Sequence, residues 1–149
     1  MLFRSRSGTE ATAQIAAFAK AVELRKKTMM SARRHMEEIR AYAVEKLTAI
    51  DDLVLIGAGT APHILSVSLA GWPSQNIVND LGAQGICISA GSACHQGKPS
   101  HVVATLGLDK RTAGGVIRLS FGPETTFEEI DRCAEALKMH HDTRMPMLK

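Results

Sequence analysis

The stretch LVLIGAGTAPHILSVSL, residues 53–69, decides the fold. Residues 53–56 and 63–69 have the composition and alternation of β-strands, and the turn at residues 57–60 lies between them. Alternate residues of the second run share a face, with Ile64, Ser66 and Ser68 on one side and Leu65, Val67 and Leu69 on the other. Because so short a connection favours antiparallel neighbours, we expect these two strands to form an antiparallel pair.

Upstream of this stretch the pattern is helical. Over residues 12–50 the apolar side chains recur at steps of three, four and seven and form one stripe: Ile15, Phe18, Val22, Met29, Met36, Ile39, Ala43, Leu47 and Ile50. Residues 7–10, SGTE, match the capping box that starts many helices. A helix of nearly forty residues would be roughly 55–60 Å long. We therefore expect it to bend, to break in two, or to connect to something outside this chain.

Downstream, shorter elements alternate. We expect a helix over residues 74–83 with Ser74 as its N-cap, a strand over 85–89, a loop over 90–100 and short helices over 101–106 and 109–113. A strand over 116–121 and a last helix, opened by the capping box of Thr126 and Glu129 and ending near His141, complete the chain. This order predicts an α+β fold with a small, mainly antiparallel sheet covered by helices. We expect one domain, with the long helix over about residues 1–50 and the α+β body over 51–149.

Composition excludes several classes of protein. The chain has 149 residues, of which 45% are hydrophobic and 22% charged, which argues against extended disorder and against a membrane protein. A formal charge of +3 is too small to indicate nucleic-acid binding, and we expect the basic clusters at residues 25–27 and 33–34 to lie on a solvated helix face. Three cysteines without a CxxC motif predict a reduced, cytoplasmic protein.

Cys94 is the strongest candidate for a reactive residue. It lies in SAGSACHQGKP, residues 89–99, among side chains too small to form a core. His95 and Lys98 would favour its thiolate, which is the nucleophilic form. The alternative is a cysteine that occurs in a loop by chance. Cys87, in an apolar strand, and Cys133, in a helix, are expected to be inert packing residues.

Arg118 is the second candidate. The alternation of the strand over residues 116–121 places Arg118 and Ser120 on the face opposite Ile117, Leu119 and Phe121. A guanidinium on a rigid strand can bind a carboxylate through two hydrogen bonds, although an ordinary surface arginine would fit the pattern equally well.

Two other motifs are weaker. Residues 57–62, GAGTAP, lack the third glycine and the following helix of a dinucleotide-binding loop. A zinc site built from Cys94 and His95, His101, His140 and His141 has no pair of ligands at a suitable spacing, so we predict no metal site.

Together, these residues resemble a known family. The segment from Ser89 to Cys94, SAGSAC, the later LGL at residues 106–108 and VIRLSFG at residues 116–122 are similar to the C-terminal part of cysteine desulfurases, which are pyridoxal-phosphate enzymes of the class-V aminotransferase family. RSGTE at residues 6–10, followed by a helix, is also similar to the family. The resemblance therefore extends from about residue 6 to the last helix. It implies the fold of the C-terminal small domain of fold-type I pyridoxal-phosphate enzymes.

The resemblance also implies roles for the two candidate residues. Cys94 would be the catalytic nucleophile that takes sulfur from L-cysteine, leaving L-alanine and an enzyme persulfide, and Arg118 would bind the substrate carboxylate. Pyridoxal phosphate would serve as the electron sink. The persulfide sulfur would pass to an acceptor protein, such as an iron–sulfur cluster scaffold or a tRNA-thiolation protein, and the full-length enzyme would be a homodimer. No contact with nucleic acid or membrane is implied.

One family feature is missing. The Schiff-base lysine of the family lies in a Ser-x-His-Lys motif of the large domain, and no lysine of this chain has that context. We therefore expect a small domain without the large cofactor-binding domain, with no cofactor-binding residue of its own and inactive alone. Because His95 follows the cysteine, a selenocysteine lyase domain is an alternative. A stand-alone, non-enzymatic persulfide carrier and an α+β domain with an incidental Cys94 are the others.

Overall fold

The computed structural model describes residues 10–57, 59–90 and 101–147. Its elements, in chain order, are α1 (Thr12–Thr48), β1 (Leu53–Leu55), β2 (Ile64–Leu69), α2 (Ser74–Ala83), β3 (Ser89–Ala90), α3 (His101–Thr105), α4 (Lys110–Gly114), β4 (Val116–Ser120) and α5 (Phe127–Thr143). The predicted α+β fold with a long N-terminal helix is confirmed. Within the described ranges, no helix is both long and apolar enough to cross a lipid bilayer.

The four strands form one antiparallel sheet in the order β1-β2-β4-β3. The predicted pairing of β1 with β2 is confirmed, with Leu53 opposite Leu69. The predicted alternation is confirmed as well, because Leu65, Val67 and Leu69 are buried whereas Ile64 is exposed. The sheet therefore has one apolar face and one face that carries serines, aliphatic residues and Arg118.

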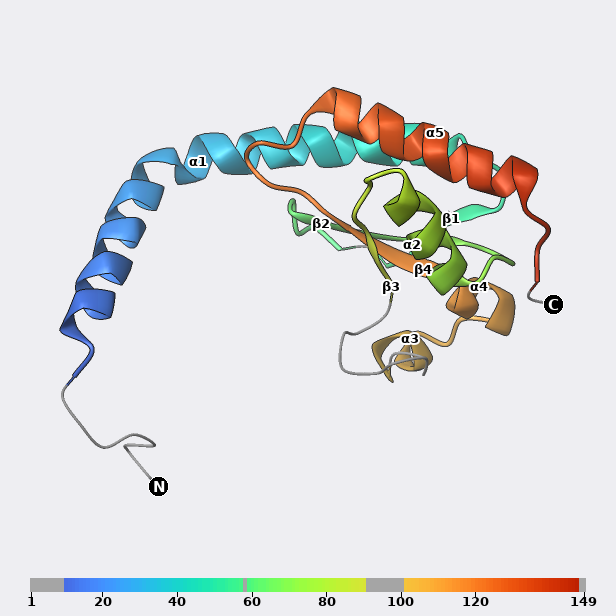
Figure 1. Ribbon diagram of the computed structural model, residues 1–149, viewed down its shortest axis with the longest axis horizontal. Coiled ribbons are helices and arrows are strands. Elements are labelled where there is room, and N and C mark those ends of the chain that lie inside the picture. The colour runs from blue at the N-terminus through green and yellow to red at the C-terminus, as the bar shows by residue number, and fades with distance from the viewer. Residues whose placement is uncertain (1–9, 58, 91–100, 148–149) are drawn as a thin grey trace, which may run out of the picture.

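Helices cover the apolar face. Figure 1 shows α1 and α5 side by side along the sheet, and α2 packs against α5, β3 and β4. The fully buried side chains of the core come from α1, α2, α5 and the sheet: Ile39, Leu47, Leu69, Ile77, Leu81, Ile117, Leu137 and Val67. Among the described residues, the opposite face is covered only at one end, where α4 packs against β2 and Ser68 donates a hydrogen bond of 2.6 Å to the carbonyl of Thr112. The rest of that face is called the open face below.

α1 is one continuous helix that bends (Figure 1). Its only buried residues are Ile39, Ala43 and Leu47, all in its C-terminal half. The hydroxyls of Thr28 and Ser31, near its middle, donate hydrogen bonds to carbonyls three residues earlier. Such contacts compete with the helical hydrogen bonds and often bend helices. The apolar stripe thus continues past the core as an exposed surface, and the basic clusters at residues 25–27 and 33–34 are solvated as predicted.

Side-chain hydrogen bonds cap the N-termini of two helices, α4 and α5. The capping box of α5 is present as predicted, with Thr126 accepting from the backbone of Glu129 and Glu129 accepting from the backbone of Thr126. The side chain of Asp109 caps α4 by accepting from the backbone N–H of Thr112. Both caps satisfy N–H groups that a helix leaves without partners.

Three local predictions were wrong or fall outside the described residues. Ser74 is the first residue of α2, and Pro73 is the N-cap, without a side-chain hydrogen bond. The strand expected over residues 85–89 is only Ser89–Ala90, because Ile86 bonds to Leu81 at the end of α2 instead of joining the sheet. Residues 7–9 of the first capping box lie outside the described residues, and Ala11 is the N-cap of α1.

Candidate functional site

Arg118 lies at the centre of the open face. It is opposite Ser66 on β2 and opposite Ser89 on β3, so the three residues form a row across three strands. Residues directly opposite each other share a face, with Cβ atoms about 4.5–5.5 Å apart. The neighbouring pair, Ile64 and Ser120, lies on the same face. The neighbours of Arg118 on this face thus include three short hydroxyl side chains, those of Ser66, Ser89 and Ser120.

The side chain of Arg118 is exposed and unpaired within the part of the chain that the structure describes. Arg33, Arg111 and Arg144 instead form ion pairs with carboxylates, at 2.9, 3.1 and 2.9 Å. The row that contains Arg118 includes no acidic residue. An unpaired guanidinium on a strand keeps its paired N–H donors available, and a carboxylate is the ligand that fits them best.

Cys94, the predicted nucleophile, lies outside the described residues. The structure therefore does not test whether Cys94 lies near Arg118. Residues 89 and 90 form β3, the strand beside Arg118, and the chain continues from there toward Cys94. The proximity of the two residues stays a prediction.

The prediction that the other two cysteines are inert packing residues was half right. Cys133 is buried in the core, and this burial raises its thiol pKa to about 11. Cys87 is exposed, because it lies in the segment between α2 and β3, which is not paired with the sheet. Both cysteines line a cavity of about 340 Å³ between that segment, β4 and α5.

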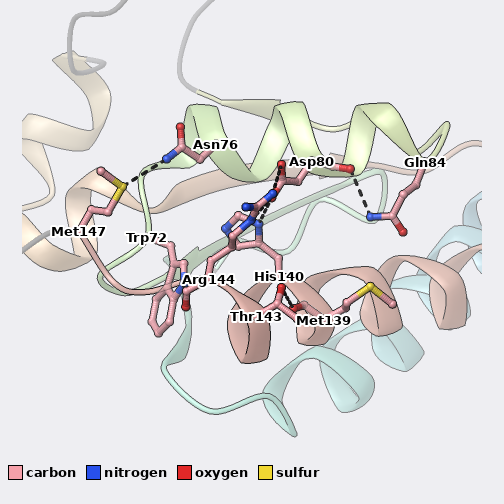
Figure 2. Close-up of polar contacts among 9 residues, drawn as sticks. All are labelled: Trp72, Asn76, Asp80, Gln84, Met139, His140, Thr143, Arg144 and Met147. Carbon is pink, nitrogen blue, oxygen red and sulfur yellow. Dashed lines mark hydrogen bonds and ion pairs between the residues drawn. The ribbon is translucent and has the colours of Figure 1, made fainter.

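A polar network at the end of α5 was not anticipated from the sequence. Figure 2 shows Asp80 of α2 bonded to Nδ1 of His140 at 2.8 Å and to Nε and Nη2 of Arg144 at 2.9 and 3.2 Å. Arg144, and secondarily His140, hold the pKa of Asp80 below its usual value. Sixty residues separate Asp80 from His140, so no local pattern in the sequence could indicate this contact.

The histidines considered for a zinc site do not assemble. His141 stacks on Trp72, with ring centroids 4.7 Å apart, whereas His140 bonds to Asp80. Among the described residues, no group of three or more His, Cys, Asp or Glu side chains could hold a metal ion. His95 and Cys94 lie outside those residues, as does the side chain of His101.

Comparison with known proteins identifies the family of this chain. The family described as Aminotransferase class-V matches residues 3–133. The chain belongs to the class-V aminotransferase family. Its resemblance to that family, inferred from the motifs around Cys94 and Arg118, is thereby confirmed.

Similar proteins are cysteine desulfurases. The chain is 34% identical over 139 residues to cysteine desulfurase IscS of Clostridium botulinum, covering 89% of this chain and 35% of that protein. It is 32% identical over 136 residues to the IscS of Proteus mirabilis, covering 89% and 33%. A solved structure of a NifS-like protein has a TM-score of 0.78 at 28% identity and covers 93% of this chain and 36% of that chain. The chain thus spans about a third of the length of the curated relatives it matches.

Proposed function

We propose that this chain is the C-terminal small domain of a pyridoxal-phosphate-dependent cysteine desulfurase, with Cys94 as the persulfide carrier and Arg118 as the anchor for the substrate carboxylate. The observation that carries the proposal is Arg118, which is exposed, has no partner among the described residues and lies beside β3, the strand that leads to Cys94. Family membership and the desulfurase relatives support it. Residues 1–50 would connect to the larger part of the enzyme, and residues 51–149 would form the body of the domain.

The covalent chain limits how far the two residues can be apart. Cys94 follows Ala90 by four residues, which span at most about 14 Å in any conformation. Ala90 is itself opposite Ile117, the neighbour of Arg118. A substrate whose carboxylate is bound by Arg118 would therefore lie within reach of the segment that follows β3. Small residues around Cys94 suit a thiol that must visit both the substrate and an acceptor.

The proposed reaction balances without an outside oxidant. L-cysteine and the Cys94 thiol give L-alanine and the Cys94 persulfide, so the substrate C–S bond breaks and one S–S bond forms. A thiolate is the attacking species. Arg118 binds and orients the substrate through its carboxylate, and the persulfide sulfur then passes to a thiol of the acceptor.

We infer that none of the described residues binds pyridoxal phosphate covalently. The lysines among them lie on α1, α4 and α5, and none lies on a strand of the sheet: Lys20, Lys26, Lys27, Lys46, Lys110 and Lys138. Lys20, Lys46 and Lys138 are already paired with carboxylates. The cofactor, its lysine, the dimer contacts and the acceptor specificity would therefore belong to other parts of the enzyme. A cytoplasmic location fits the free thiols of Cys87 and Cys133.

A chimera tests this function. This chain would replace the matching third of the C. botulinum relative, and alanine and sulfide would be measured after addition of L-cysteine and a reductant. We expect turnover by the chimera and none by the 149-residue chain with added pyridoxal phosphate. Cys94→Ser should abolish turnover. Arg118→Lys should raise KM by about 10- to 100-fold, because two charge-assisted hydrogen bonds are reduced to one.

Matched variants separate the roles. Cys87→Ser should leave turnover unchanged, because Cys87 lies on the cavity beside α5 and not in the Arg118 row. A chimera that releases alanine with Cys94→Ser as fast as without it would refute the assignment of Cys94. Turnover of selenocysteine but not cysteine would identify a selenocysteine lyase instead. Alanine production by the isolated chain would contradict the absence of the cofactor site.

A further inference from the structure

A serine hydroxyl without a partner lies next to Arg118 in the sheet. Ser66 of β2 is directly opposite Arg118 of β4, so the two side chains share the open face. Ser66 is half-buried, and its hydroxyl forms no hydrogen bond within the described ranges. The function proposed above gives a role to Arg118 and none to this hydroxyl.

The next serine on the same face of β2 shows how a structural hydroxyl is bonded here. Ser68 is fully buried, and it donates a hydrogen bond of 2.6 Å to the carbonyl of Thr112. Hydroxyls inside proteins normally have such partners, because an unmade hydrogen bond is costly. Ser66 has no such partner among the described residues, and water can reach it because it is only half-buried. A ligand that displaces this water can therefore bond to Ser66.

The hydrogen-bond pattern of the sheet brings Ser66 close to Arg118. The N–H of Phe121 donates to the carbonyl of His63 at 2.9 Å, and hydrogen-bonded and non-hydrogen-bonded pairs alternate along antiparallel strands. Ser66 and Arg118, three positions further along, therefore form a non-hydrogen-bonded pair, in which the Cα atoms are about 4.5 Å apart and the side chains are closest. The main-chain N–H and C=O of Arg118 point toward Ser89 on β3 instead. Ser66 is thus the closer of the two cross-strand neighbours.

A guanidinium and a hydroxyl in this arrangement suit a carboxylate. Arg118 offers paired N–H donors with a positive charge, and Ser66 offers one O–H donor that can rotate toward a bound oxygen. An ionised carboxylate has about four lone-pair sites, so it can accept from both side chains at once. The row across the three strands contains no acidic residue that would compete for these donors.

We propose that Ser66 donates a hydrogen bond to the carboxylate that Arg118 binds and thereby fixes the orientation of an α-amino acid substrate. The identity of the substrate rests on the proposed function, whereas the carboxylate site depends neither on Cys94 nor on turnover. The donors of a single guanidinium leave a carboxylate able to pivot about them. A further donor on the neighbouring strand restricts this movement, which places the rest of the substrate more precisely.

Carboxylate binding by the full 149-residue chain tests the inference without turnover. The probe is L-alanine, and the readout is the Nε–H signal of Arg118 in a ¹⁵N-arginine-labelled chain, identified by its loss in Arg118→Lys. We expect this signal to shift with L-alanine and not with ethylamine, which lacks only the carboxylate. Ser66→Ala should weaken L-alanine binding about tenfold, as expected for loss of one hydrogen bond to a charged group. Ser66→Thr, which keeps the hydroxyl, should restore most of the affinity.

Ser120→Ala is the matched control, because Ser120 is on the same face but lies opposite Ile64. It should leave the affinity nearly unchanged. Equal losses in Ser66→Ala and Ser120→Ala would overturn the proposal. Unchanged affinity in Ser66→Ala, or no response of Arg118 to L-alanine in the unaltered chain, would overturn it as well.

The chimera described above separates this inference from the proposed function. In it, Ser66→Ala should raise KM for L-cysteine and leave kcat largely unchanged, because the hydroxyl binds the carboxylate and not the reacting sulfur. An inactive chimera, with the L-alanine site intact in the 149-residue chain, would refute the proposed function alone. An active chimera in which Ser66→Ala leaves KM unchanged would refute the role of Ser66 alone.

Discussion

At the scale of single residues, Asp80 links α2 to the end of α5 through Arg144 and His140. Its pKa is lowered from the usual 3.8, first by the hydrogen bond from Arg144 and then by that from His140. A carboxyl whose pKa falls on folding stabilises the protein above its unfolded pKa, and this contribution is lost as the pH falls through the folded pKa. Asp80→Asn should therefore lower the free energy of unfolding at pH 7 and have progressively less effect below pH 3.8.

The measurement is urea unfolding at a series of pH values. Asp51→Asn is the matched control, since Asp51 is exposed and forms no hydrogen bond or ion pair in the described ranges, and its charge acts only weakly on Lys138. Its effect should stay small and should not follow the Asp80 pattern. An Asp80→Asn effect that is the same at pH 7 and at pH 2.5 would contradict the ionic role of this carboxylate.

Two cysteines differ sharply in their surroundings. With a thiol pKa of about 11, Cys133 has roughly one thiol in ten thousand ionised at pH 7, and it is buried as well. Cys87 is exposed. In a Cys94→Ser background, iodoacetamide should modify Cys87 readily and Cys133 only after unfolding, as mass spectrometry of the digested protein would show. Equal rates in the native protein would be inconsistent with the packing of α5.

At the scale of elements, the start of α5 depends on the capping box of Thr126 and Glu129. Thr126→Ala should lower the free energy of unfolding by about 1 kcal/mol, because the backbone N–H of Glu129 loses its hydrogen-bond acceptor. Glu135→Ala changes an exposed residue of the same helix and should alter stability by less than about 0.5 kcal/mol. If both variants unfolded at the same urea concentration, the cap would contribute nothing to α5.

Gly115 determines how β4 enters the sheet. A Cβ atom at this position would collide with the backbone carbonyl of Leu69 on β2, so Gly115→Ala should destabilise the protein by about 1–3 kcal/mol. Gly82, inside α2, has no atom near the position of an added Cβ, and Gly82→Ala should stabilise by about 0.5–1 kcal/mol. Thermal unfolding compares the two, and a stabilising Gly115→Ala would show that β4 is placed wrongly.

At the scale of the whole molecule, stability is uneven along α1. Its buried residues lie between Ile39 and Leu47, whereas Phe18 and Val22 are exposed. In proteins most of the stability of a helix comes from tertiary packing of an apolar face, and the first half of α1 is exposed. Hydrogen exchange should therefore be fast over residues 14–28 and slow over residues 39–48. Leu47→Ala should cost about 2–5 kcal/mol, whereas Phe18→Gln should leave the unfolding midpoint nearly unchanged.

The general plan of the molecule follows from the sequence because each element carries a local pattern. The helical stripe from Ile15 to Ile50, the alternation of residues 63–69 and the box at Thr126 each specify their own segment. The long helix was anticipated from its apolar stripe, and its length left a bend, a break or a connection outside this chain as alternatives, of which the structure shows the bend. The exposure of its first half depends on where the core ends. The burial of Cys87 was predicted wrongly, because the sequence of a short apolar run does not show whether the run pairs with the sheet.

The site was only partly predictable for a related reason. Strand alternation placed Arg118 on the open face, but its neighbours Ser66 and Ser89 come from other strands and depend on register. The contact of Asp80 with His140 and Arg144 depends on how two helices pack, which no local pattern encodes. The role of Cys94 stays a prediction, because it lies outside the described residues.

Trp72 has a practical consequence for spectroscopy. It is the only tryptophan, its side chain is buried, and it contacts the ring of His141 and the carbonyl of Arg144. Tryptophan emission therefore reports on one corner of the protein, whereas far-ultraviolet circular dichroism is dominated by α1 and α5. Fraying of the exposed half of α1 would change the dichroism without changing the emission. Melting curves from the two signals should then differ even when the core unfolds in a single step.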